Sequence, residues 1–382
     1  MTRALPITLA AGALALTLAS PTLAGEAKRS NFGTLPDGRA VPAVTLTNSH
    51  GVSATVIALG ASLQSLIIPD RNGRKADVMI GYDSLEGYAT KPEYFGATVG
   101  RVANRVAGGK FSFDGHAYAT PVNNGPNSLH GGTKGFDKVL WEVVDTKSEP
   151  SASVTLRYVS PDGDMGYPGT LTTLATYSLD EKNQLTIEYR ATTDKPTLVN
   201  ISNHAYWNLA DSGSPGGAMG HVVTIPAERY TPTDATSIPT GKLPSVAGTV
   251  FDFRTPHAIG ERVRDGRDTQ IVYGRGYDHN WVIGTAVTAQ PHLMAKVTEP
   301  VSGRGFELWS NQPGLQFYSG NFFDGTVVGK GGQIYRMGDA IVMEPQLFPD
   351  APNQPGFPSA RLDPGQTYRN TIIYKLVTGA KR

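Results

Sequence analysis

The sequence has 382 residues, no cysteine, and 34 basic against 33 acidic residues, which gives a formal net charge of +1. Without cysteine the chain can form no disulfide, no thiolate metal site and no cysteine nucleophile, so a packed core must stabilise it. The balanced charge gives no reason to expect a nucleic-acid partner or an acidic polymer. The composition favours a ligand that is small and neutral, or one that is bound by geometry and not by the electric field of the protein.

The first 24 residues have the pattern of a cleavable secretory signal. Arg3 precedes an apolar run that extends to about Leu18, and small residues lead to Ala24. The run is too short, and too closely followed by the polar sequence GEAKRS, to favour a membrane anchor. We therefore expect a mature chain of residues 25–382 that is exported, most simply to the periplasm, and is not held in a membrane after cleavage.

The rest of the chain shows the patterns of antiparallel strands. Apolar and polar residues alternate with a period of two in residues 154–158 and 185–190, which is typical of strands with one buried face. Turn sequences separate runs of this kind, and each predicts a hairpin. These turns are Asn72-Gly73, Asp114-Gly115 and the polar sequence DEKN at 180–183.

Helical patterns are nearly absent. The 44 glycines and 27 prolines are too many for a helical protein of this size, and only the sequence DSLEGY near Asp83 predicts a short helix. No repeat of about forty to fifty residues indicates a propeller, and no linker divides the chain. The sequence predicts one all-β domain over residues 25–382, folded as a large antiparallel sandwich.

Five polar segments, rich in Gly, Asn or Pro, interrupt the strand patterns. Loops of this kind on a rigid sheet are where binding groups usually lie. Together they hold guanidinium, imidazole, carboxylate and amide groups for hydroxyls, and aromatic rings for the apolar face of a sugar. They are GRVANRVAGG (100–109), NNGPNSLHGG (123–132), NISNHAYWNL (200–209), GYDHNW (276–281) and VMEPQLFPD (342–350).

Taken singly, most of these side chains have a structural explanation beside the functional one. His130 can bond its own turn, Asp278 can cap a strand, and Arg101 and Arg105 can be surface or core-bridging charges. Glu344 differs, because it follows the apolar run IVM, where a carboxylate is costly unless it is paired or functional. A functional role is therefore favoured for Glu344.

The chain lacks the patterns of several common catalytic sites. Its eight histidines are spread singly, without the spacing of a preformed zinc site. It contains no Gly-x-Ser-x-Gly elbow and no phosphate-binding Gly-x₄-Gly-Lys-[Ser/Thr] loop. We therefore expect neither a bound metal nor an organic cofactor.

Seven segments, taken together and in this order, resemble the aldose 1-epimerase (galactose mutarotase) family. The resemblance extends from about Leu46 to Lys375. It implies a large antiparallel β-supersandwich and an isomerase that interconverts the α and β anomers of free aldohexoses such as glucose and galactose. The segments are GRVANRVAGGKFSFDG, NNGPNSLHGGTKGFDKVLW, SPDGDMGYPGTL, ISNHAYWNL, YDHNWV, QFYSGNFFDG and EPQLFPDAPNQPGFPS.

The resemblance also implies roles for individual residues. Glu344 falls on the position of the catalytic base, and His204 on that of the catalytic acid. The substrate-binding positions that it implies are Asn104, Arg105, His130, Tyr206, Asp278 and Gln316, of which Gln316 enters only through the resemblance. The chain departs from the family's common residues at Ala205, Trp207 and Leu347, which we expect to bear on sugar preference, and at Leu59, which we expect to alter packing only.

The implied chemistry needs two proton carriers. Opening a cyclic hemiacetal removes the proton of the C1 hydroxyl and delivers one to the ring oxygen. A carboxylate base and an imidazolium acid suit this exchange. Their reference pKa values, ~4.3 for the carboxyl and ~6.5 for the imidazole, bracket the protonation states that the reaction needs around neutral pH. The only partner that this chemistry requires is a monosaccharide, and the sequence leaves the oligomeric state open.

Two alternatives belong to other functional classes. An exported, lectin-like protein could keep the sandwich and the sugar site without catalysis. A hexose-phosphate epimerase would need a cluster of basic residues for the phosphate, and the motifs offer only Arg101 and Arg105.

Overall fold

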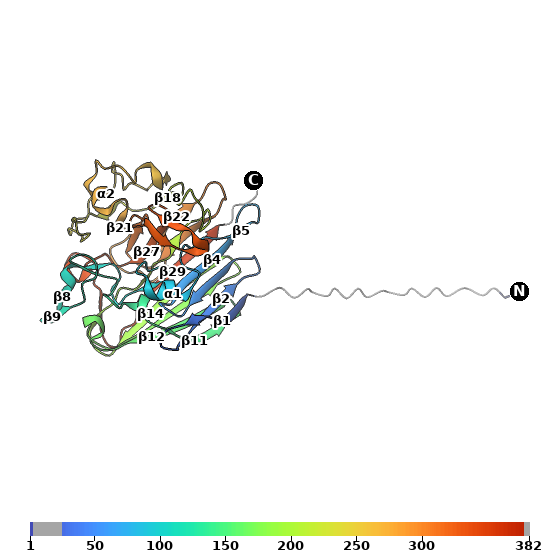
Figure 1. Ribbon diagram of the computed structural model, residues 1–382, viewed down its shortest axis with the longest axis horizontal. Helices are drawn as coiled ribbons and strands as arrows, with labels where there is room; N and C mark the ends of the chain where they lie inside the picture. Colours follow the sequence, from blue (N-terminus) through green and yellow to red (C-terminus); the bar gives the residue numbers. More distant parts are fainter. Residues whose placement is uncertain (3–24, 378–382) are drawn as a thin grey trace.

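The computed structural model describes residues 1–2 and 25–377, and antiparallel strands are its main regular secondary structure (Figure 1). Apart from its first two residues, the predicted secretory signal lies outside the described residues. In the described ranges no helix has both the length and the apolar character needed to cross a bilayer. The all-β, antiparallel architecture predicted from the sequence is confirmed.

The largest sheet has nine strands in the order β11-β12-β13-β14-β29-β23-β22-β18-β20. The alternation seen in the sequence is confirmed here, because Leu156 and Ile187 are buried while the exposed Arg157 points to the other face. The strands are β11 (Glu142–Lys147), β12 (Ala152–Ser160), β13 (Leu171–Leu179), β14 (Gln184–Thr193), β18 (Val222–Thr224), β20 (His257–Ala258), β22 (His292–Thr298), β23 (Gly305–Ser310) and β29 (Tyr368–Val377).

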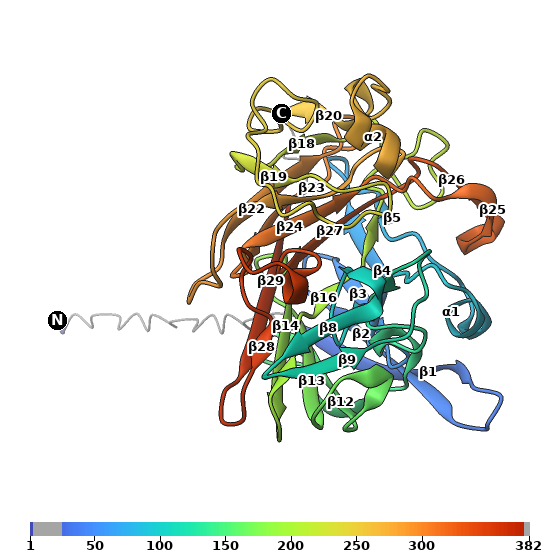
Figure 2. The ribbon, with the colours of Figure 1, turned by 90° about the vertical axis from the view of Figure 1, so that its left-hand side faces the viewer.

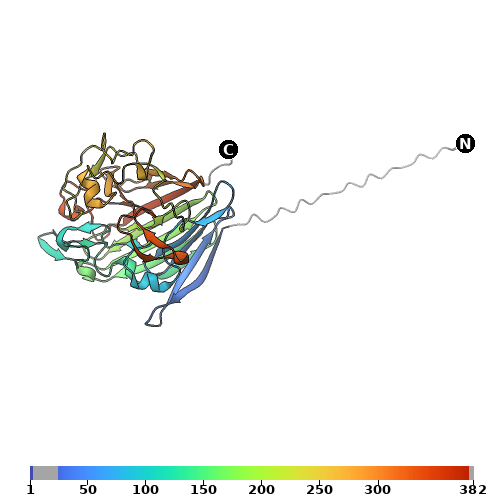
Figure 3. The ribbon, with the colours of Figure 1, turned by 45° about the horizontal axis from the view of Figure 1, so that its top comes forward.

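A second sheet contains the first five strands in chain order. The β1–β2 hairpin extends beyond the rest of this sheet, as the blue ribbon in Figures 2 and 3 shows. All three hairpins predicted from turn sequences are confirmed, between β4 and β5, β8 and β9, and β13 and β14. The strands are β1 (Glu26–Thr34), β2 (Ala40–Thr47), β3 (Ser53–Ile57), β4 (Ser62–Pro69) and β5 (Lys75–Asp77).

A third sheet, with five strands in the order β17-β27-β24-β21-β19, carries most of the residues singled out from the sequence. Its order differs from chain order, so segments far apart in the sequence become neighbours. Glu344 lies within β27, which continues two residues past it, and not after the strand as the sequence suggested. The strands are β17 (Tyr206–Trp207), β19 (Arg229–Thr231), β21 (Asp278–Val282), β24 (Gly314–Tyr318) and β27 (Ile341–Gln346).

Five pairs of short strands form two-stranded sheets in the segments that connect the three large sheets. The pairs are β6 (Thr98–Val99) with β16 (Ser202–Asn203), β7 (Arg105–Val106) with β10 (Ser128–Leu129), β8 (Lys110–Phe113) with β9 (His116–Ala119), β15 (Thr197–Leu198) with β28 (Arg361–Leu362), and β25 (Asp324–Val328) with β26 (Ile334–Arg336).

In the part of the chain that the structure describes, helical structure is limited to two α-helices of six residues each and to 3₁₀ turns. The short helix predicted near Asp83 is confirmed as α1 (Leu85–Thr90), and α2 (Thr269–Gly274), which the sequence analysis did not predict, begins after the N-cap Asp268. The 3₁₀ turns are η1 (Ala107–Gly109), η2 (Phe136–Lys138), η3 (Asp164–Gly166), η4 (Ile259–Glu261), η5 (Lys330–Gly332) and η6 (Ala351–Asn353).

The main hydrophobic core includes buried residues from all three large sheets. Among its largest members, Trp141, Trp207 and Trp281 are fully buried. The ring of Trp207 packs against Phe306 and Tyr374, with both centroid distances at 4.6 Å. This core ties β17, which carries Trp207, to the nine-stranded sheet, and so gives the third sheet a rigid support.

Candidate active site

One face of the third sheet gathers the polar residues of three separate segments. Asn280, Gln316 and Glu344 lie directly opposite one another on β21, β24 and β27. Because side chains alternate between the faces of a sheet, the row two residues along faces the same side. That second row consists of Asp278, Tyr318, Val342 and Tyr206.

The segment 200–209 shows the same alternation and explains the position of its histidine. His204 lines the pocket described below, whereas Asn203 and Trp207 belong to the fully buried side of the chain. The side-chain amide of Asn203 donates to the carbonyl oxygen of Gly96 at 2.8 Å. Asn203 and Trp207 therefore anchor the segment, and His204 and Tyr206 reach the pocket.

A pocket of about 440 Å³ opens over this face of the sheet. Gln316 does not line the pocket but lies behind Asp278, to which its amide donates at 2.7 Å. The structure thus brings together all the residues that the family resemblance implied. Those that line the pocket are Asn104, Arg105, His130, His204, Tyr206, Asp278 and Glu344.

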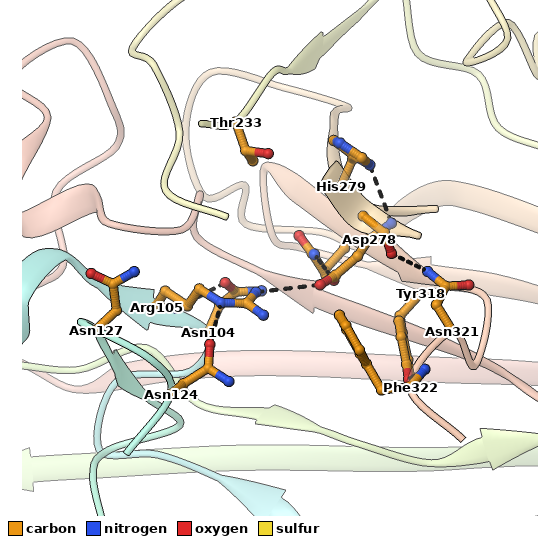
Figure 4. A network of polar contacts seen from close by, with 12 residues as sticks. Asn104, Arg105, Asn124, Asn127, Thr233, Asp278, His279, Tyr318, Asn321 and Phe322 are labelled. Atoms are coloured by element: carbon orange, nitrogen blue, oxygen red, sulfur yellow. Dashed lines mark hydrogen bonds and ion pairs between the residues drawn. The ribbon is translucent and has the colours of Figure 1, made fainter. Parts of the chain in front are cut away.

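A buried ion pair crosses the pocket wall. Nη1 of Arg105 lies 3.4 Å from Oδ2 of Asp278, and Nε of Arg105 donates to the side-chain oxygen of Asn124 at 2.9 Å. Figure 4 shows Arg105 held between these two partners. With Gln316 on its other oxygen, the Asp278 carboxylate is fixed from two sides, so it can present a rigid acceptor to a ligand hydroxyl.

His130 is held in one tautomer by the backbone. Its Nδ1 accepts a hydrogen bond from the N–H of Asn104 at 3.1 Å, so the proton of the neutral ring is on Nε2. Burial, together with the nearby His204 and Arg105, lowers the pKa of His130 well below its usual value. His130 is therefore a neutral ring that offers Nε2–H as a hydrogen-bond donor.

His204 and Glu344 face each other across the pocket floor. Nε2 of His204 lies 4.0 Å from Oε2 of Glu344, and both side chains are buried. This separation is too long for a direct hydrogen bond. It is short enough for both groups to contact two oxygens bonded to a single carbon atom of a ligand.

Burial opposes charge on both members of this pair. It lowers the pKa of His204 to about 4, and it raises the pKa of Glu344 well above its usual value. Asp278 raises the pKa of Glu344 further, whereas Arg105 opposes that rise. Burial of the two groups therefore favours a neutral imidazole and a carboxyl that holds the proton. The reference pKa values of free carboxyl and imidazole groups therefore do not apply to these two buried side chains.

Three side chains in the pocket are close enough to suggest a metal site. His130, His204 and Glu344 each offer a donor atom, and these atoms lie within 4.8 Å of one another. A metal needs a bare ring nitrogen, but Nδ1 of His130 is occupied by the Asn104 N–H and Nε2 carries the proton. The cluster is therefore arranged as hydrogen-bonding and proton-carrying groups and does not fit a metal ion, although the histidine spacing in the sequence gave no sign that these residues meet.

Comparison with known proteins agrees with this arrangement. The family model described as aldose 1-epimerase matches residues 42–375. The chain is 44% identical to galactose mutarotase from Rattus norvegicus over 347 residues, which is 91% of this chain and 97% of the relative. The chain belongs to the aldose 1-epimerase family. Aldose 1-epimerase from Escherichia coli (strain K12) is 36% identical over 90% of this chain and 97% of its own length.

Solved structures in this family have the same fold. Galactose 1-epimerase from Lactobacillus acidophilus NCFM superposes with a TM-score of 0.81 and 28% identity, covering 93% of this chain and 99% of its own. An aldose epimerase homologue from C. elegans superposes with a TM-score of 0.79 and 34% identity, covering 87% and 97%. The galactose mutarotase-like supersandwich expected from the sequence is thus confirmed.

The residues at which the chain departs from the aldose 1-epimerase pattern lie outside the pocket. Ala205 and Trp207 are buried on the core side of their segment. Leu347 packs in a small separate cluster that includes Val102 and Val106. None of these three departures lines the pocket, so their expected effect on sugar preference stays a prediction that would act through the packing behind the pocket.

Several residues that line the pocket were not assigned a role from the sequence. Tyr318, Phe322 and Phe323 form part of one wall, and the motif QFYSGNFFDG that contains them was a signal for this position. Figure 4 shows Tyr318 and Phe322 side by side, and their rings stack with centroids 5.7 Å apart. Tyr94 also lines the pocket, and no pattern in the sequence pointed to it.

Chelators should leave the activity unchanged. Nδ1 of His130 already accepts a hydrogen bond from Asn104, and without His130 the cluster retains only His204 and Glu344, which are too few protein ligands for a metal site. The measurement is the rate of anomer exchange, followed by polarimetry, before and after dialysis against EDTA, with thermal unfolding of the same samples as the control for metal-dependent stability. If EDTA removes the activity and an added divalent metal restores it, the reading of this cluster is wrong.

Proposed function

We propose that the chain is an aldose 1-epimerase that interconverts the α and β anomers of free aldohexoses of the glucose and galactose class. The observation that carries this proposal is the separation of 4.0 Å between His204 and Glu344 on the floor of a pocket whose walls offer groups that bind hydroxyls. The relatives named galactose mutarotase and aldose 1-epimerase support the same reaction.

Sugar binding uses the fixed polar groups of the pocket. The carboxylate of Asp278 accepts from sugar hydroxyls, and the remaining guanidinium N–H groups of Arg105 and the amide of Asn104 donate to them. His130 donates its Nε2–H to a further sugar oxygen. Because these groups are held by protein hydrogen bonds before the sugar arrives, little freedom is lost on binding.

Ring opening then requires one proton to leave the sugar and one to enter it. The carboxylate of Glu344 accepts the proton of the C1 hydroxyl, and the electron pair of that O–H bond forms the carbonyl at C1. The bond between C1 and the ring oxygen breaks, and the imidazolium of His204 donates its proton to that oxygen. After rotation about C1–C2 the same steps run in reverse and give the other anomer.

The protonation of the pair fits this cycle. The ionised form, with a Glu344 carboxylate and a His204 imidazolium, contains the same single proton as the neutral form that burial favours. A bound sugar donates its C1 hydroxyl to the carboxylate and accepts from the imidazolium at its ring oxygen. Both hydrogen bonds favour the charged forms, so the substrate itself shifts the pair toward the state that reacts.

The two alternatives have less support. In a lectin without catalysis, a buried carboxyl such as Glu344, whose Oε1 has no hydrogen-bond partner among the described residues, would cost stability without a function. For a hexose phosphate, the two candidate arginines are already engaged: Arg101 donates to the backbone carbonyls of Pro168 and Gly169, and Arg105 pairs with Asp278. Inhibition of anomer exchange by millimolar hexose 6-phosphate, with none by the free hexose, would favour the phosphate alternative.

The chain is also proposed to act outside the cytoplasm. The support is the N-terminal sequence alone, with Arg3, an apolar run and small residues before Ala24. A mutarotase in that location would act on free sugars before uptake, and on no sugar that has been phosphorylated inside the cell.

Export should remove about the first 24 residues, because small residues occupy the positions that a signal peptidase reads. Mass spectrometry of the protein from its native host, separated into periplasmic, culture and cytoplasmic fractions, should find an N-terminus near Gly25 in the exported fractions. An intact Met1 on the soluble, active protein would contradict the proposed export without affecting the proposed reaction.

Glu344→Gln should lower kcat by ~10²-fold or more, because glutamine keeps the shape of the side chain and cannot accept the proton. His204→Asn should have a similar effect for the other proton. Polarimetry of freshly dissolved α-D-glucose and α-D-galactose supplies the rates, after subtraction of the spontaneous reaction.

Glu299→Gln is the matched control for the loss of a buried carboxyl. The carboxylate of Glu299 lies outside the pocket and accepts hydrogen bonds from the backbone N–H groups of Val301 and Ser302. It should lower stability and leave kcat of the folded protein nearly unchanged. A Glu344→Gln variant that keeps more than about a tenth of wild-type turnover would show that Glu344 is not the general base.

The pH profile of kcat/KM should stay high well below the usual range of histidine. The free enzyme is active while His204 and Glu344 together hold one proton. When a second proton binds, no carboxylate remains to act as the base. Because burial lowers the pKa of His204 to about 4, the acid limb should lie near that value, and kcat/KM at about pH 5.5 should be within about twofold of its value at about pH 7. An acid limb at about 6.5 would mean that the imidazole is solvated in the working enzyme.

A further inference from the structure

The orientation of His204 raises a question that the proposed function does not answer. Catalytic histidines are usually oriented by a hydrogen bond to the second ring nitrogen. Nδ1 of His204 is buried and has no hydrogen-bond partner among the residues that the structure describes. The packing of neighbouring rings must therefore set the direction in which Nε2 points.

Three rings enclose this imidazole. The ring centroids of His130 and Tyr206 lie 5.0 Å from that of His204, and the ring of Tyr94 lies 5.8 Å away. His130 and Tyr206 already have roles toward the sugar. Tyr94 contacts both histidines, since its ring also lies 4.8 Å from that of His130 in an edge-to-face arrangement.

The backbone holds Tyr94 in an unusual conformation to reach this place. Its φ is +59°, in the left-handed region that large side chains rarely occupy. Hydrogen bonds tie the following residues to the histidine itself: the N–H of Gly96 donates to the carbonyl of His204 at 3.0 Å, and the N–H of His204 donates to the carbonyl of Ala97 at 2.8 Å. Strain of this kind persists where the surrounding structure requires it.

The ring of Tyr94 is also fixed on its other sides. Nζ of Lys138 lies 5.9 Å from the ring centroid, and that ammonium group donates to the carbonyl of Lys91 at 2.6 Å. The side-chain amide of Asn123 lies 3.5 Å from the Tyr94 hydroxyl. The ring is thus a rigid wall between the loop of residues 91–97 and the two histidines.

We propose that Tyr94 is a positioning residue, whose ring holds the imidazole of His204 toward the ring oxygen of the sugar and keeps bulk water away from it. This inference rests on the proposed function for its kinetic consequences. The part that concerns the contact between the two side chains can be tested without any sugar.

Water exclusion by Tyr94 has a consequence for the protonation of His204. The groups that face the imidazole are Glu344, His130, Tyr206 and Tyr94, with Asp278 farther away. Burial is the largest influence on the pKa of His204 and lowers it. Removing the Tyr94 ring admits water from the side of residues 91–97, so the pKa of His204 should rise toward its ordinary value.

Two variants separate the ring from the hydroxyl and from the strained backbone. Tyr94→Phe keeps the ring, so kcat should stay within about threefold of wild type. Tyr94→Gly removes the ring and also suits the left-handed backbone, so the protein should fold. In this variant kcat should fall about tenfold or more while KM changes less, because the acid is misdirected in the transition state.

The acid limb of the kcat/KM profile should move to higher pH in Tyr94→Gly and stay in place in Tyr94→Phe. Tyr273→Ala serves as the control, since Tyr273 lies in α2 on the surface, away from the pocket, and it should change neither kcat nor the profile. Thermal unfolding of each variant shows that the compared proteins are folded.

NMR of the sugar-free protein supplies the independent readout. The titration of the His204 ring, assigned with His204→Asn, should shift upward in Tyr94→Gly and not in Tyr94→Phe. An unmoved titration together with unchanged kcat in the folded glycine variant overturns the proposal, as does an equal loss in the phenylalanine variant. A shifted titration in a protein without mutarotase activity would instead contradict the proposed function and leave the contact established.

Discussion

The active site depends on a carboxyl group buried in the middle of a β-strand with no cation of its own. The charge of Arg105 acts on Glu344, but Arg105 is paired with Asp278, and the partner that lies close to Glu344 is His204 at 4.0 Å. Arg105 and Asp278 cancel each other, and the Glu344–His204 pair is neutral overall while it holds one proton. The floor of the pocket therefore has no net charge, which suits a neutral sugar, and its polarity is concentrated in groups that can exchange a proton.

The sheet provides the precision that this chemistry needs. Glu344 and Gln316 are directly opposite each other on paired strands, and Gln316 in turn holds Asp278 on the next strand. An error of one residue in register would turn every one of these side chains to the other face. The proposed base Glu344 and the proposed hydroxyl acceptor Asp278 are therefore fixed by backbone pairing, whereas His204 comes from a short strand connection and needs its neighbours to orient it.

Local sequence patterns predicted much of the fold and part of the site. The hairpins and the alternating strands were visible because turn chemistry and a period of two are properties of adjacent residues. Glu344 was noticeable for the same reason, as a carboxylate beside an apolar run. The same period of two places Ala205 and Trp207, which alternate with His204 and Tyr206, on the core side and not in the pocket.

Other features depend on contacts between distant segments, and no local pattern carries them. The tautomer of His130 is set by the N–H of Asn104, and Tyr94 meets His204 only because β6 pairs with β16. The order β17-β27-β24-β21 differs from chain order, so the sequence could name the residues of the site without placing them. Family resemblance supplied their roles, and the structure supplied the distances and the protonation of the pair.

The orientation of His204 by rings, without an acidic partner on Nδ1, agrees with the reversibility of the proposed reaction. A carboxylate bonded to Nδ1 would stabilise the imidazolium and hold the proton on the histidine. Anomer exchange requires the opposite property, because the proton that His204 donates during ring opening must return to it during closure, while Glu344 passes its proton the other way. Burial disfavours charge on both groups and so favours the neutral form of the pair, while the hydrogen bonds of the bound sugar favour the ionised form. Packing against aromatic rings orients the imidazole without placing a charge beside it. A group that must both donate a proton and take it back requires this combination.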